Sequence, residues 1–81
     1  MRHEAREQAD ELQIRCAWVR LRTKASAKVL QKPRRFRDTL DRVAMDEAKT
    51  LRAIGGERLA GAFLRAYEAA EPTEILEGRL D

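Results

Sequence analysis

The residue types that most often do chemistry are scarce in this chain and are not grouped. His3 is the only histidine and Cys16 the only cysteine, so they cannot build a His-based metal site, a proton relay or an intrachain disulfide. Glu4, Glu7 and Glu11 share one face of a predicted helix, where carboxylates near the N-terminus stabilise the helix without any catalytic role. No glycine-rich phosphate loop follows a strand. We therefore predict a protein that is not an enzyme and that carries no metal and no cofactor.

The residues that could bind an anion are strongly segregated along the chain. Residues 12–37 include nine Lys or Arg and no Asp or Glu, whereas residues 38–81 include six bases and ten acids. A four-residue spacing sets several of these bases on one stripe of a helix, and the others follow directly after Pro33. The candidate anion-binding or nucleic-acid-binding residues are Arg20, Lys24, Lys28, Lys32, Arg34, Arg35 and Arg37. They could neutralise successive phosphates of a nucleic acid, or they could form a solvated face paired with acids elsewhere.

Residues 4–31 lack any helix-breaking residue and carry two apolar faces at helical spacing. One face has 4-3 spacing and consists of Ala5, Ala9, Leu12, Cys16, Val19, Thr23, Ser26 and Leu30. We expect it to face the core of the chain, with Cys16 as a small buried hydrophobe. The second face consists of Ile14, Trp18, Leu21, Ala25 and Val29. A helix packed on one neighbour needs only a stripe of about 100°, so the excess predicts contacts on two sides.

The second face is the candidate site for a protein partner, with Trp18 as the anchor because tryptophan is enriched among residues that dominate interface energy. The alternative is that another helix of the same chain covers this face. The leading hypothesis is a non-catalytic adaptor, inhibitor or regulatory subunit that docks on a protein target through the first helix, and a homodimer is a further expectation. The alternative function is a nucleic-acid-binding accessory or regulatory protein that uses the basic stripe of residues 15–37.

Breaks in the pattern predict an all-α fold, either a three-helix bundle or a helical hairpin. Pro33 cannot continue the helix over 4–31 but fits the first position of a new one, and Gly55-Gly56 is a typical helix stop. We therefore expect a second helix over 33–54, a third over 57–70, and a short C-terminal turn near 74–77. The first helix would be about 40 Å long at 1.5 Å per residue, so it should overhang the rest.

Glu47 lies in the middle of the apolar face of the predicted second helix. An unpaired buried carboxylate would be strongly destabilising, so we expect either an edge position or an arginine partner. Arg15 and Arg22 interrupt an apolar region of the first helix. They are the candidate partners.

The length and composition predict one small helical domain over 1–81. Hydrophobic residues make up 43% of the 81 residues but only four are aromatic, so the core must consist mainly of aliphatic side chains and alanine. The first residues lack the apolar segment of a signal peptide, and no apolar run has the length of a membrane span. We expect a cytoplasmic protein without a membrane partner.

Overall fold

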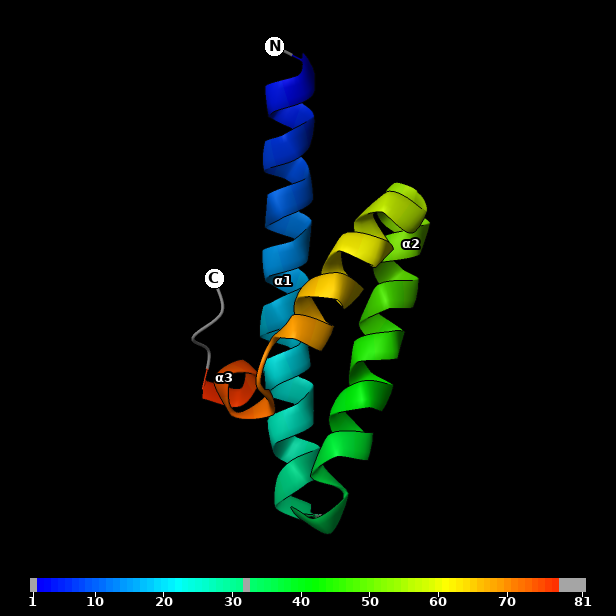
Figure 1. The fold of residues 1–81 in the computed structure, drawn as a ribbon. Coiled ribbons are helices and arrows are strands. Elements are labelled where there is room, and N and C mark those ends of the chain that lie inside the picture. The colour runs from blue at the N-terminus through cyan, green and yellow to red at the C-terminus, as the bar shows by residue number, and fades with distance from the viewer. Residues whose placement is uncertain (1, 32, 78–81) are drawn as a thin grey trace.

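The computed structural model describes the backbone of residues 2–31 and 33–77, and the side chains of residues 7–29, 31 and 34–77. The elements are α1 (Arg2–Gln31), a 3-10 turn η1 (Pro33–Arg35), α2 (Phe36–Ala69) and α3 (Pro72–Glu77) (Figure 1). The described part of the chain holds helices and no strand. The predicted all-α class, the long first helix and the short C-terminal turn are therefore confirmed.

The element α2 consists of two helical arms that meet at a sharp turn. Gly56 has φ 75° and ψ −168°, a conformation that residues with a Cβ rarely adopt. A Cβ added to Gly55 would lie 2.9 Å from the Cβ of Leu59, so this position also requires glycine. We call residues 36–55 the first arm and residues 57–69 the second arm. The predicted break at Gly55-Gly56 is confirmed.

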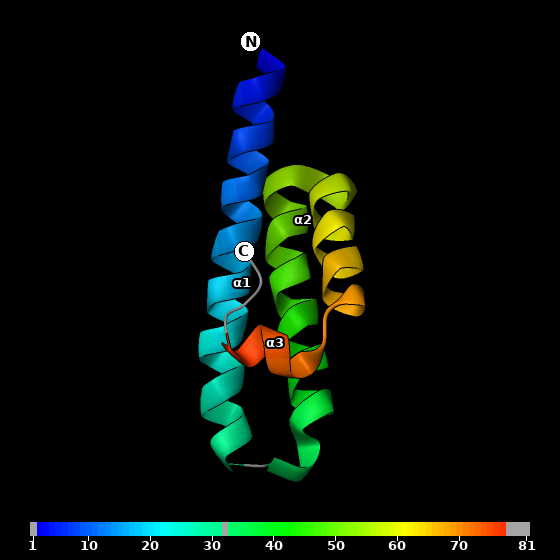
Figure 2. The ribbon, with the colours of Figure 1, turned by 60° about the vertical axis from the view of Figure 1, so that its left-hand side comes forward.

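The helices form a compact bundle from which one end of α1 extends. The first arm of α2 runs antiparallel to α1, and the second arm runs back beside the first (Figures 1 and 2). The end of the second arm leads into α3, which also contacts α1. The molecule measures 46 × 22 × 19 Å, and the N-terminal end of α1 projects beyond the other helices in both views. The predicted overhang of the first helix is therefore present.

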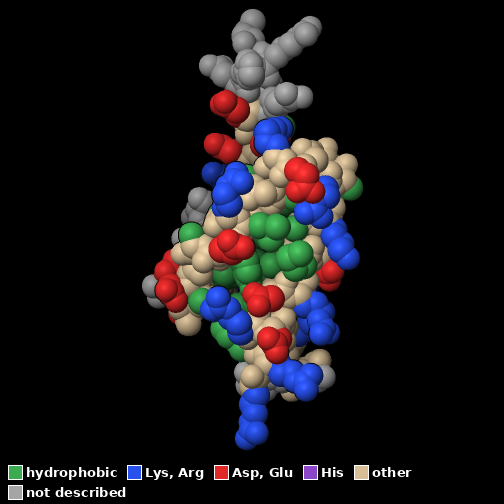
Figure 3. All heavy atoms as spheres, turned by 45° about the vertical axis from the view of Figure 1, so that its right-hand side comes forward, with side chains coloured by type: hydrophobic (Ala, Val, Ile, Leu, Met, Phe, Trp, Pro, Cys, Tyr) green, Lys and Arg blue, Asp and Glu red, His purple; other side chains and the backbone are tan. Residues whose placement is uncertain are grey.

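The core receives side chains from every helix. Its fully or nearly fully buried apolar residues are Ala17, Leu21, Ala25, Leu40, Val43, Ala44, Ala48, Leu51, Leu59, Ala60, Phe63 and Ile75. Trp18 packs against this cluster, with its ring centroid 4.9 Å from that of Phe63 and 6.5 Å from that of Tyr67. Figure 3 shows that some hydrophobic side chains remain visible in the middle of one face, among charged side chains of both signs.

The face of α1 that enters the core is not the one predicted from the 4-3 spacing. Leu12 and Val19 of that stripe are 59% and 51% exposed, whereas Leu21 of the other face is fully buried. The prediction that the 4-3 stripe faces the core is wrong. The physical reason is side-chain size, because Ile14, Trp18 and Leu21 remove more apolar surface from water than the alanine, cysteine, serine and threonine that make up most of the 4-3 stripe.

A hydrogen bond links the two arms of α2. The hydroxyl of Tyr67 in the second arm donates to Oδ1 of Asp41 in the first arm at 2.5 Å. Burial, this hydrogen bond and the negative charge of Asp41 raise the pKa of Tyr67, while the charge of Arg37 lowers it by less. In the unfolded chain a tyrosine loses its proton near pH 10. The folded state therefore retains a proton that the unfolded state releases above about pH 10.

We expect the free energy of unfolding to fall as the pH rises above about 10, and Tyr67→Phe to remove that part of the slope. Urea denaturation of both proteins between about pH 8 and pH 11 measures it. The chain has one tyrosine, so ultraviolet titration follows the Tyr67 hydroxyl directly. Parallel stability curves for the two proteins above pH 10 would contradict the raised pKa.

Candidate functional site

The face predicted to bind a protein partner lies largely inside the fold. Leu21 and Ala25 are 0% exposed, and Ile14 and Trp18 are partly buried against the core. Val29 is also partly buried. In this fold Leu21 and Ala25 are not accessible to a partner, which corrects the predicted site. The alternative, that the chain covers this face itself, agrees with the contact between Trp18 and Phe63 of the second arm.

The outward face of α1 is the 4-3 stripe that the sequence suggested for the core. Leu12 and Val19 are its large exposed residues, at 59% and 51%. Cys16 lies between them and is partly buried, and Thr23, one turn after Val19, donates its hydroxyl to the Val19 carbonyl at 2.9 Å. We call Ala9, Leu12, Cys16, Val19, Thr23 and Ser26 the outer stripe of α1. The two terminal residues of the predicted stripe, Ala5 and Leu30, have side chains outside the described set.

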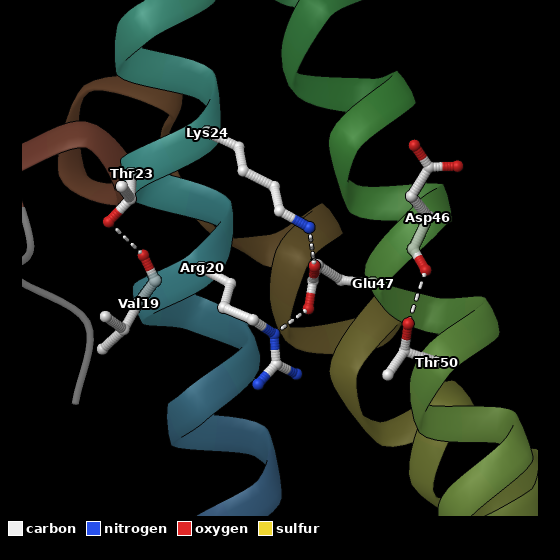
Figure 4. Close-up of polar contacts among 7 residues, drawn as sticks. All are labelled: Val19, Arg20, Thr23, Lys24, Asp46, Glu47 and Thr50. Atoms are coloured by element: carbon white, nitrogen blue, oxygen red, sulfur yellow. Dashed lines mark hydrogen bonds and ion pairs between the residues drawn. The ribbon is translucent and has the colours of Figure 1, made fainter.

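Two of the predicted anion-binding residues form ion pairs with a buried carboxylate of the same chain. Arg20 donates from Nε to Oε1 of Glu47 at 2.7 Å, and Lys24 donates from Nζ to Oε2 at 3.0 Å (Figure 4). The Glu47 side chain is 2% exposed, against 39% for Arg20 and 53% for Lys24. The predicted arginine partner of Glu47 is therefore present.

The partner of Glu47 is Arg20, and the prediction of Arg15 or Arg22 is wrong. Arg20 and Lys24 are one helical turn apart and lie on the edge of α1 that faces the first arm, so both reach the same carboxylate. Arg15 is exposed and Arg22 is partly exposed. The 100° rotation per residue sets both of them toward the opposite edge of the helix.

The remaining predicted cations lie at or beside the turn between α1 and α2, which is formed by η1 (Pro33–Arg35) and which we call the elbow. Arg34, Arg35 and Arg37 are exposed, as is Lys28, and Figure 3 shows Lys and Arg side chains at this lower end of the molecule. Within the described residues none of these four forms an ion pair within 4 Å. Lys32 lies outside the described residues. Among the described residues, the predicted anion-binding set thus divides into a pair neutralised by Glu47 and an elbow group without acid partners.

Among the described side chains, those of residues 7–29, 31 and 34–77, no group of three or more His, Cys, Asp or Glu is placed to hold a metal ion. None of the helices described is long and apolar enough to cross a membrane. Comparison with known protein families, curated proteins and solved structures found no match. The described surface offers two candidate functional features, the outer stripe of α1 and the elbow.

Proposed function

We propose that this chain is a non-catalytic docking protein, an adaptor, inhibitor or regulatory subunit, which binds a helix of a protein target along the outer stripe of α1. The observation that supports this function is the exposure of Leu12 and Val19, at 59% and 51%, on a helix whose other apolar face already packs in the core. Spacing of 4-3 is the spacing with which one helix packs against another in a coiled coil. The proposed interface therefore keeps the predicted helix and changes the face.

The charges beside the outer stripe indicate the chemistry of the partner helix. Arg15 and Arg22 lie along one edge of the stripe, and no acid occupies a flanking position between residues 8 and 29. A second copy packed antiparallel would oppose these arginines with the same arginines, and a second copy packed parallel would offer them no acid. Like charges at flanking positions disfavour a helix pair. We infer a partner helix with an apolar stripe and flanking Asp or Glu.

A pair of designed peptides tests this function. Both would form a helix with a Leu and Ile stripe at 4-3 spacing, one with Glu at the flanking positions and the other with Lys. We expect the Glu peptide to bind and the Lys peptide to bind at least about tenfold more weakly. Leu12→Asp with Val19→Asp should weaken binding of the Glu peptide by about tenfold or more, as measured by fluorescence anisotropy.

Met45→Asp is the matched control, because Met45 is 50% exposed on the first arm of α2 and lies outside the outer stripe. It should leave peptide binding unchanged. Equal binding of the two peptides, or equal effects of the control and the double variant, would contradict the proposed docking face. Light scattering that detects a dimer, lost in the double variant, would instead identify a second copy as the occupant of the stripe.

Nucleic-acid binding through the elbow is the second candidate function. It is favoured by one observation, that Lys28, Arg34 and Arg35 form no ion pair among the described residues. Arg20 and Lys24 are paired with Glu47, so the basic stripe available to a nucleic acid is shorter than the sequence suggested. The docking function is therefore the leading candidate.

A further inference from the structure

The elbow contains a cavity that neither candidate function by itself explains. Its volume is about 280 Å³, and it lies where α1, η1 and the start of α2 meet. The lining residues are Lys28, Gln31, Arg35, Asp38, Thr39 and Arg42. Arg42 was not among the predicted anion-binding residues, because it lies beyond the basic segment and reaches the site only through the turn at the elbow.

The lining of this cavity carries unneutralised positive charge. Lys28, Arg35 and Arg42 face the space together with a single carboxylate, Asp38. In the described part of the chain none of these four side chains forms an ion pair within 4 Å. By contrast, Lys24, one turn before Lys28 on α1, is bound to Glu47 at 3.0 Å. Within the described residues, Glu47 therefore neutralises Lys24, whereas the lining of the cavity keeps a surplus of two positive charges.

Arg35, which lines the cavity, also lies at the start of α2. Arg35 occupies the N-cap position of α2, and no side chain caps this helix end by a hydrogen bond. An uncapped helix N-terminus favours an anion, because its amide dipoles point toward that end. The cations and the concave shape thus coincide at one place, next to the start of α2.

We propose that this cavity binds one phosphate group, or two linked ones, of a phosphate-bearing anion. Arg35 and Arg42 supply planar guanidinium groups that can each donate two parallel hydrogen bonds to phosphate oxygens, and Lys28 supplies a compact charge. Thr39 adds a hydroxyl donor. The surplus of two charges matches a phosphate monoester, which carries about −1.5 to −2 at neutral pH. The volume is below the range of about 300–1,000 Å³ typical of pockets for larger ligands.

Isothermal titration calorimetry with pyrophosphate at low ionic strength tests the proposal. We expect saturable binding that weakens by about tenfold or more in Lys28→Gln and in Arg42→Gln, since each removes a charged hydrogen bond. Asp38→Asn should strengthen binding, because it removes a negative charge from the cavity wall. Lys49→Gln is the matched control, an exposed lysine of α2 outside the cavity, and it should bind like the original protein.

An oligonucleotide arm separates two sources of the phosphate group. If a single-stranded oligonucleotide without a terminal phosphate binds and pyrophosphate does not, and the same variants weaken it, the site takes a phosphate of a nucleic-acid backbone. Each cavity cation removed should then reduce the salt dependence by about one unit. Binding of neither ligand at low salt, or equal losses in Lys49→Gln and Arg42→Gln, would overturn the phosphate site. The docking function along α1 is unaffected by either result.

Discussion

The double variant Arg20→Met with Lys24→Met is expected to lower the free energy of unfolding by about 3 kcal/mol. The double variant leaves the Glu47 carboxylate, 2% exposed, without either of its charged hydrogen-bond donors. A buried charge without a partner is strongly destabilising. We expect the low end of the usual range, because Arg20 and Lys24 are 39% and 53% exposed and water can reach this edge of the site.

A third substitution, Glu47→Leu in the same background, provides the decisive control. It should recover most of the lost stability, because a buried ion pair replaced by apolar groups of similar volume is often neutral or stabilising. Arg15→Met, which changes an exposed arginine without a described ion pair, should change stability by less than about 0.5 kcal/mol. Urea denaturation at pH 7 measures all three. A loss of stability that the third substitution does not reverse would show that the packing of Arg20 and Lys24, and not their charge, holds the helices.

Phe63→Ala is expected to lower the free energy of unfolding by about 3–5 kcal/mol. Phe63 is 0% exposed and is the largest fully buried side chain of the core. Its removal leaves a cavity at the place where the second arm of α2 meets Trp18 of α1, whose ring centroid is 4.9 Å away. A chain of 81 residues has a marginal total stability, so this loss should produce a visible unfolded population at room temperature.

The fluorescence of Trp18, the only tryptophan, reports this change during urea denaturation. Phe63→Leu is the matched variant and should lose clearly less, because it removes less volume and keeps an apolar side chain against Trp18. Ile54→Ala provides the exposed control, since Ile54 is 54% exposed and should change stability little. A loss below about 1 kcal/mol for Phe63→Ala would contradict the packing of the second arm on α1.

The helix boundaries were accessible from the sequence because they depend on local backbone chemistry. Pro33 lacks an amide hydrogen and cannot continue a helix, and the chain does turn there into η1. Gly56 adopts a positive φ that other residues rarely take, so the pair of glycines indicates a turn wherever it follows a helix. The need of Glu47 for a cation was also predictable, because it follows from placing a carboxylate on an apolar face.

The tertiary structure alone decided which of the two apolar faces of α1 lies inside, and hence where a partner could bind. Both faces repeat at helical spacing, so periodicity could not separate the outer stripe around Leu12 and Val19 from the buried face around Leu21. The choice of Arg20 over Arg15 for Glu47, and the meeting of Lys28 with Arg42, likewise depend on the direction in which the elbow sends α2 past α1. These contacts join residues far apart in the chain, and such contacts follow from the packing of whole helices, which local spacing does not specify.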